Sequence, residues 1–297
     1  MKLQIAQRHQ VKLRIGLSGA SGFGKTMSSI LLAYGITNDY SKIAIIDTEN
    51  GSASLYSHLG PYNVLTLDEP YNPERYIQAI EMCEKSKIEV IIIDSITQEW
   101  SGKGGCLEIH ESLGGRFQDW SKVSPRHQAF IDKILNSDCH IITTVRRKID
   151  YSLDSDMNGK NKVVKHGTKE ITREGFEYEL TVNFEIINDK HLAKASKDRT
   201  GLFMDKPEFV INASTGKKLM EWCSQGISFD KISNEIELCS TEEELKKLYE
   251  KYPSFKNQTY PLIVAKKEQL EISKQQIISE EQIIEPKTVV ANGNSIK

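Results

Sequence analysis

The chain has 297 residues, of which 38% are hydrophobic and 27% are charged. This composition is typical of a globular protein, and the length allows one large domain with an appendage or two modest domains. The formal net charge of −2 excludes a surface that is basic throughout, so any binding to nucleic acid must depend on a local basic patch.

Location and redox environment are indicated by what the sequence contains at its start and by its cysteines. No apolar run approaches the ~18 residues of a membrane span, and the opening MKLQIAQRHQ contains no apolar export segment. The cysteines are odd in number and widely spaced, without a C-x-x-C pair, which argues against a disulfide framework and against a zinc site. We therefore expect a cytoplasmic protein that does not contact a membrane. The cysteines are Cys83, Cys106, Cys139, Cys223 and Cys239.

The first 35 residues carry the clearest functional signal. Apolar and polar residues alternate over residues 11–18, which predicts a strand, and apolar residues at helical spacing predict a helix over 24–34 that Gly35 closes. Between them GASGFGKT, residues 19–26, fits the P-loop pattern G-x-x-x-x-G-K-[ST] in full. The strand before the loop and the helix after it favour a nucleotide site over a glycine-rich turn that binds nothing.

Each residue type in this loop has a physical task. The glycines let the backbone curl so that N–H groups point at phosphate oxygens, and the helix N-terminus adds partial positive charge. Lys25 would bridge the β- and γ-phosphates of ATP, and the Thr26 hydroxyl would hold Mg²⁺. The residues that we expect to bind the nucleotide are Gly19, Ala20, Ser21, Gly22, Phe23, Gly24, Lys25, Thr26 and Met27.

Two later strands end in acidic residues. The apolar runs IAIID (residues 43–47) and EVIIIDS (residues 89–95) predict strands that are buried on both faces of a parallel sheet. Asp94 has the Walker B position at the end of the second run, where it would hold Mg²⁺ together with Thr26. A short strand over residues 63–67 and a helix from Asn72 to about Lys85 are expected between these runs.

A glycine-rich segment follows Asp94. Residues 98–125 contain Trp100 and Trp120, and a loop of this length is uncommon in a compact domain unless it binds something. The two tryptophans can be packing residues or platforms on which bases stack, and the sequence leaves both readings open. A helix that begins at Ser124 and a fifth strand over residues 139–145 complete a β-α alternation.

The character of the chain changes at Arg146. Residues 146–173 contain eight basic and four acidic residues, a local balance of +4, and a hairpin tip is expected at residues 156–159. This segment can be a solvated hairpin or a contact for the backbone of single-stranded nucleic acid. Strands are expected over residues 176–187 and 191–195, and a short helix over 219–223.

We expect three parts in all. Residues 1–226 would form the nucleotide-binding core and residues 227–271 a small helical region, with one helix opened by a capping box at Ser240 and a second over 260–270. Residues 272–297 are polar and low in aromatic residues, which predicts a disordered tail.

The segment IAIIDTENGSASLY resembles the part of RecA-type recombinases in which an aspartate-x-glutamate ends the second core strand. The resemblance implies that Glu49 polarises the attacking water and that Thr144, or its neighbour Thr143, senses the γ-phosphate. It further implies that Lys197 and Arg199 of KASKDRTG reach the nucleotide of a neighbouring subunit. In that family two DNA-binding loops occupy the places of the glycine-rich and basic segments.

Phage-encoded AAA-type ATPases with a shortened RecA core, some of them single-strand annealing proteins, are the most similar group. The residues that carry this resemblance are GASGFGKT, DTENGSASLY, IIIDSITQEW, REGFEYE and KDRTGLF. It implies an α/β fold with a mainly parallel sheet flanked by helices, an antiparallel extension after the fifth strand, and a small C-terminal helical segment. Only about ten residues precede the first strand, so we expect no N-terminal polymerisation helix.

The functional hypothesis is an ATPase that uses ATP and Mg²⁺ and acts on single-stranded DNA in recombination, annealing or replication. It would form a homo-oligomer with nucleotide at the subunit interface, with a single-strand-binding protein as a further partner. Two alternatives stay open: a nucleotide-dependent loader or adaptor that acts on a protein partner, and a small-molecule phosphotransferase, for which the sequence offers no arginine-rich lid.

Overall fold

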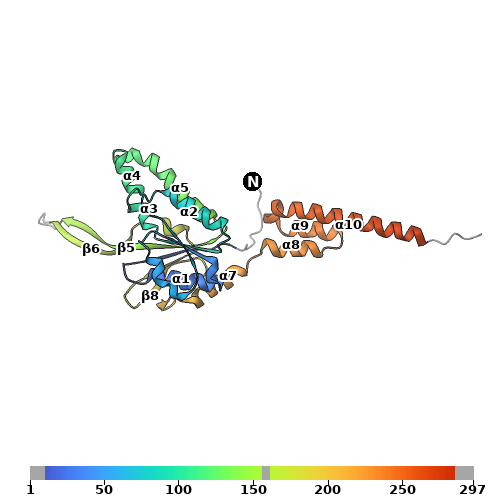
Figure 1. Cartoon of the computed structure of the whole chain (residues 1–297), viewed down its shortest axis with the longest axis horizontal. Coiled ribbons are helices and arrows are strands. Elements are labelled where there is room, and N and C mark those ends of the chain that lie inside the picture. Colours follow the sequence, from blue (N-terminus) through green and yellow to red (C-terminus); the bar gives the residue numbers. More distant parts are fainter. Residues whose placement is uncertain (1–10, 156–160, 285–297) are drawn as a thin grey trace, which may run out of the picture. The chain divides into compact units, whose positions relative to one another are not determined.

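The computed structural model describes residues 11–155 and 161–284 of the chain (Figure 1). These residues form two compact units, one from Val11 to Cys223 and one that begins at Ser224.

A mainly parallel sheet forms the centre of the first unit. Counted from one edge, the first six strands run parallel, and the last two, β8 and β9, continue the sheet in antiparallel pairing. The register places Asp47 directly beside Asp94, so the carboxyl ends of two neighbouring strands meet at one edge. From edge to edge the strands are β3 (Asn63–Thr66), β2 (Ile43–Asp47), β4 (Val90–Asp94), β5 (His140–Ser155), β1 (Arg14–Gly19), β7 (Val182–Ile186), β8 (Leu192–Asp198) and β9 (Phe209–Val210).

Helices cover both faces of this sheet, as Figure 1 shows. Alternate residues of a strand point to opposite faces. On one face, Val90 and Ile92 pack with helices α1 (Lys25–Thr37) and α7 (Ala213–Ser224). On the other face, Ile91 and Ile93 pack with α2 (Pro73–Lys85) and α5 (Trp120–Asn136). Burial of each such side chain contributes roughly 1.5–3 kcal/mol. The predicted α/β fold with two covered faces is confirmed.

Helix α1 continues past the glycine that was expected to close it. It ends at Thr37, and Asn38 adopts the left-handed cap conformation with φ 53°. Gly35 instead lies where α1 meets α7: a Cβ there would come within 2.0 Å of the Ala213 carbonyl oxygen, and one on Gly216 within 2.1 Å of the Leu32 carbonyl oxygen. The prediction that Gly35 ends the helix was wrong because the glycine serves close helix packing.

The segment that was expected to be a long loop is largely helical. It forms α3 (Thr97–Ser101), α4 (Cys106–Ser112), the 3-10 turn η3 (Phe117–Asp119) and the beginning of α5, which starts at Trp120 and not at Ser124. Gly102 and Gly105 flank the break between α3 and α4, so the glycines mark helix ends.

The basic segment forms the expected hairpin. Strand β5 continues beyond the sheet and pairs in antiparallel fashion with β6 (Asn161–Glu170). The expected tip at residues 156–159 lies outside the described residues. Downstream, the single strand predicted over 176–187 is wrong, because one helical turn, α6 (Phe176–Glu179), precedes β7.

The second unit is a small helical bundle. Helices α8 (Phe229–Leu238), α9 (Glu242–Lys251) and α10 (Lys256–Ile284), with the 3-10 turn η4 (Pro253–Phe255), enclose a core that includes Ile232, Ile236, Leu245 and Tyr252. The capping box of α9 uses Thr241 and Glu244, one residue later than expected. The expected disorder is wrong for residues 272–284, which belong to α10; residues 285–297 lie outside the described part. Within the described residues, none of the helices has the length and apolarity that a bilayer crossing requires.

Candidate nucleotide-binding site

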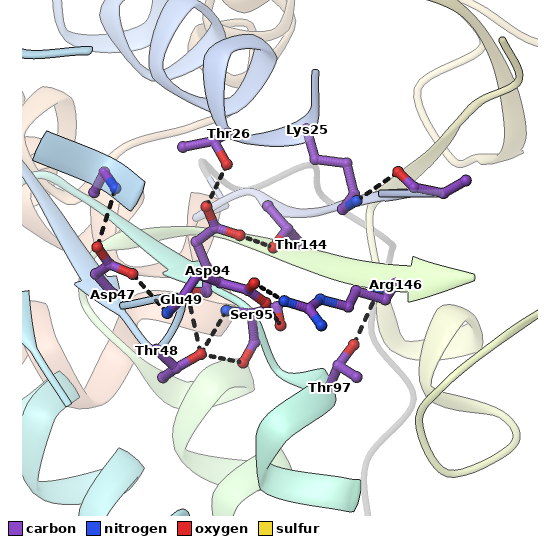
Figure 2. A network of polar contacts seen from close by, with 12 residues as sticks. Lys25, Thr26, Asp47, Thr48, Glu49, Asp94, Ser95, Thr97, Thr144 and Arg146 are labelled. Atoms are coloured by element: carbon purple, nitrogen blue, oxygen red, sulfur yellow. Dashed lines mark hydrogen bonds and ion pairs between the residues drawn. The ribbon is translucent and has the colours of Figure 1, made fainter. Parts of the chain in front are cut away.

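The P-loop joins β1 to α1 at the carboxyl edge of the sheet. Gly22 and Gly24 have φ values of 80° and 87°, a backbone region that strains any residue with a side chain. The Lys25 ammonium group donates hydrogen bonds to the carbonyl oxygens of Gly19 and Ala20, at 3.1 and 2.9 Å. Burial lowers the pKa of Lys25. The loop therefore holds its lysine folded back over its own backbone (Figure 2).

Asp94 lies next to the start of α1. The Thr26 hydroxyl donates to one carboxylate oxygen of Asp94 at 2.6 Å, and the Thr144 hydroxyl donates to the other. Asp94 is 2% exposed, and burial raises its pKa. A hydroxyl and a carboxylate oxygen at this separation are the hard donors that Mg²⁺ prefers, so Thr26 and Asp94 fit the metal role predicted for them.

The structure distinguishes the two candidate threonines of β5. Thr144 contacts Asp94, whereas the Thr143 hydroxyl donates to the Ile15 carbonyl oxygen at 3.3 Å and so faces β1. Only Thr144, of this pair, has its hydroxyl at the Walker B carboxylate. The sensing role itself stays a prediction.

Glu49 lies in the turn that follows β2. Asp47, which is fully buried, fixes this turn by accepting hydrogen bonds from the backbone N–H groups of Glu49 (2.7 Å) and Ala53 (3.0 Å). The Glu49 carboxylate accepts a hydrogen bond from the Ser95 hydroxyl at 2.9 Å and forms an ion pair with Arg146. Figure 2 shows Glu49, Ser95 and Arg146 converging beside Asp94.

Arg146 is a site residue that the sequence analysis assigned only to the basic segment. Its backbone N–H donates to the Thr97 hydroxyl at 2.9 Å, and its guanidinium group contacts Glu49. Its position two residues after Thr144, directly after the strand that the sequence predicts over residues 139–145, is the signal that could have placed it here. His191 was also missed: its Nδ1 lies 2.9 Å from the Phe23 carbonyl oxygen.

These groups surround one cavity of about 570 Å³. Its lining brings together the P-loop, Glu49, Asp94 and Arg146, while the Gly19 and Ala20 carbonyl groups hold Lys25 in place. Lys25 and Glu49 therefore line the same cavity. The lining residues from the expected P-loop set are Ser21, Gly22, Gly24, Lys25, Thr26 and Met27.

Lys197 and Arg199 lie elsewhere. Both side chains donate to the Tyr178 carbonyl oxygen, Arg199 through Nη2 at 2.6 Å, and neither is among the described residues that line the cavity. Partial burial and the neighbouring Arg199 lower the pKa of Lys197. Within one chain, the structure does not bring these two cations to the site.

Part of the positive charge of residues 146–173 is neutralised locally. Arg147 pairs with Glu170 at 3.3 Å and with Glu185 at 3.4 Å, and Lys169 pairs with Glu174. The hairpin therefore offers less free charge than its composition indicated.

The two tryptophans of the segment that was expected to be a loop pack on each other. Trp100 and Trp120 stack with ring centroids 5.6 Å apart, and His110 stacks on Trp120 at 4.1 Å. This arrangement favours the packing reading of the two alternatives.

Comparison with known proteins gives a family and a distant structural likeness. A sequence model of the AAA domain family (AAA_24) matches residues 11–218, more than half of the chain. A search of curated proteins gives no match. The ATPase of a type III secretion system of pathogenic bacteria is similar at 14% identity and a TM-score of 0.36; the match covers 59% of this chain and 51% of that one, so the chain spans about half of that protein's length.

Proposed function

The chain belongs to the AAA domain family of P-loop ATPases, and we propose that its ATPase cycle acts on single-stranded DNA in recombination, annealing or replication. The site residues have the chemistry for ATP hydrolysis. Lys25 stabilises charge on the phosphates, and Glu49 accepts a proton from the attacking water. Thr26 and Asp94 would hold Mg²⁺, which would neutralise charge on the phosphates.

One observation carries the link to DNA. Strand β5 contributes Thr144 and Arg146 to the ATP site, and the same strand continues without a break into the basic hairpin with β6. Arg146 is the residue at which the two regions meet. A polyanion bound along the hairpin therefore acts on the strand that holds the partner of Glu49.

The remaining parts of the proposal concern assembly and location. Lys197 and Arg199 are cations that the nucleotide site of their own chain does not use, which supports a role at a neighbouring subunit's ATP in a homo-oligomer. A single-strand-binding protein is a further proposed partner, and the cytoplasm is the proposed location.

The test is the ATPase rate of the full chain with and without single-stranded DNA at two salt concentrations. We expect stimulation by DNA that weakens steeply as salt rises, because contacts to phosphate release counterions. Lys148→Glu should reduce the stimulation and leave the basal rate unchanged, whereas Lys218→Glu on α7, also an exposed lysine, should behave as the unmodified chain does.

Three other outcomes would contradict the proposal. Stimulation by a small metabolite alone would indicate a phosphotransferase. A rate that neither DNA nor metabolites change would favour a loader that responds to a protein partner. Stronger stimulation by RNA than by DNA would change the substrate class.

A further inference from the structure

Three buried side chains with metal-binding atoms converge among the helices that follow Asp94. Glu99 of α3, Cys106 at the start of α4 and His127 of α5 are exposed by 1%, 0% and 4%. Cys106 Sγ lies 3.1 Å from Glu99 Oε1 and 4.0 Å from His127 Nδ1, and His127 Nδ1 lies 3.0 Å from Glu99 Oε1. The nucleotide site uses none of these groups.

These separations match those of ligands around one ion. A point equidistant from three atoms at 3.1, 3.0 and 4.0 Å separations lies about 2.0 Å from each of them, the length of Zn–N and Zn–O bonds, and the sulfur would need to move outward by about 0.3 Å for a Zn–S bond of about 2.3 Å. Glu99 Oε2 is 3.1 Å from the same histidine nitrogen, so the carboxylate can supply a second oxygen. Both carboxylate oxygens, the sulfur and the nitrogen together make four donor atoms.

We propose that Glu99, Cys106 and His127 form a structural site for zinc. A thiolate, an imidazole and a carboxylate are the ligand types that Zn²⁺ takes. A thiolate and a carboxylate carry two negative charges, which a divalent ion balances, so the loaded site is neutral in a buried environment.

In this segment the ion would have a structural role. Helices α3 and α4 have five and seven residues, too short to be stable alone. One side chain from each of α3, α4 and α5 meets at the cluster, so an ion bound to all three would add to the ring stacking of Trp100, His110 and Trp120 that already joins these helices. The ion would stabilise the segment from Thr97 to His127 by binding the folded form alone.

The cysteine spacing alone argued against a zinc site. Six residues separate Glu99 from Cys106 and twenty separate Cys106 from His127, so no short motif marks the site. In the absence of an ion, the Cys106 thiol donates a hydrogen bond to the Glu99 carboxylate at 3.1 Å. Zinc binding would release the thiol proton.

The experiment measures metal in the full chain. Protein from zinc-supplemented cells should carry one zinc per chain, and exchange with Co²⁺ should give a thiolate-to-cobalt charge-transfer band and visible d–d bands. Cys106→Ala should lose the charge-transfer band and at least nine tenths of the zinc. Cys83→Ala, a buried thiol elsewhere, and Cys239→Ala, a more accessible one, should keep both signals.

Two results would overturn the proposal. The first is an unmodified chain with little zinc and no thiolate band after Co²⁺ addition, which would leave a hydrogen-bonded cluster without a metal. The second is full retention of zinc by Cys106→Ala. If that variant does not fold, the Co²⁺ spectrum of the unmodified chain still decides the question.

Discussion

Glu49→Gln tests the assignment of the catalytic base. Glutamine has the shape of glutamate, and its side-chain oxygen can still accept the hydrogen bond from Ser95 that the carboxylate accepts at 2.9 Å. It cannot take a proton from water. We expect ATP hydrolysis to fall by at least ~10²-fold, which corresponds to about 2.7 kcal/mol of transition-state stabilisation.

The cost to the fold should be much smaller than this kinetic effect. The ion pair that the variant loses joins side chains that are 16% and 41% exposed, and such pairs contribute about 0–1 kcal/mol. A change of that size shifts Tm by no more than about 2–4 °C in a domain of this length. Nucleotide affinity should change little, since Lys25 and Thr26 are untouched.

The assay is steady-state phosphate release, with binding of a fluorescent ATP analogue and thermal unfolding measured on the same preparations. Glu89→Gln is the matched control, because Glu89 also forms an ion pair, with Lys42 at 3.4 Å. Glu89 directly precedes β4, at the end of the strand opposite to Asp94. Turnover by Glu49→Gln within a few-fold of the unmodified chain would refute the assignment. A loss of nucleotide binding as large as the loss of turnover would show that Glu49 holds the ligand instead.

Three further predictions concern other parts of the molecule. Gly216→Ala should destabilise the core by roughly 1–3 kcal/mol in chemical unfolding, because its Cβ would meet the Leu32 carbonyl oxygen at 2.1 Å; an unchanged midpoint would show that α1 and α7 can separate. His140 accepts a hydrogen bond from the Leu13 N–H at 3.0 Å, and burial lowers the pKa of His140 to about 3. The free energy of unfolding should therefore fall by up to about 1.4 kcal/mol per pH unit as the pH drops from about 6.5, the pKa of an unfolded histidine, toward 3. His140→Gln should reduce this slope. Lys197→Ala mixed with Glu49→Gln should recover part of the ATPase activity if Lys197 acts on a neighbouring subunit, and no recovery at any ratio would count against that role.

The local parts of the nucleotide site could be predicted from the sequence. Loop geometry in GASGFGKT depends on glycines at fixed positions, and a run such as VIIID can only be a buried strand that delivers Asp94 to the sheet edge. That β2 lies beside β4, which places Asp47 next to Asp94, is a pairing between distant segments that the structure adds.

Other features depend on contacts that no local pattern records. Arg146 faces Glu49, 97 positions earlier in the chain, and only the orientation of β5 decides that it points there and not along the hairpin. The glycines near residues 102–105 looked like a loop because a glycine that ends a helix and one that crosses a loop have the same local signature. The end of α10 was placed too early because a polar segment without glycine or proline is compatible with both a helix and a disordered tail.

The two hydroxyl groups on Asp94 have a consequence for the order of ligand binding. Thr26 and Thr144 satisfy both oxygens of this buried carboxylate, so the chain can fold without leaving a costly orphan charge in its interior. A cation that displaces one of these hydrogen bonds loses roughly 1.5–3 kcal/mol of binding free energy. Free magnesium should therefore bind weakly. The ion should enter already attached to the triphosphate, because the contacts of the triphosphate with the P-loop offset the free energy lost at Asp94.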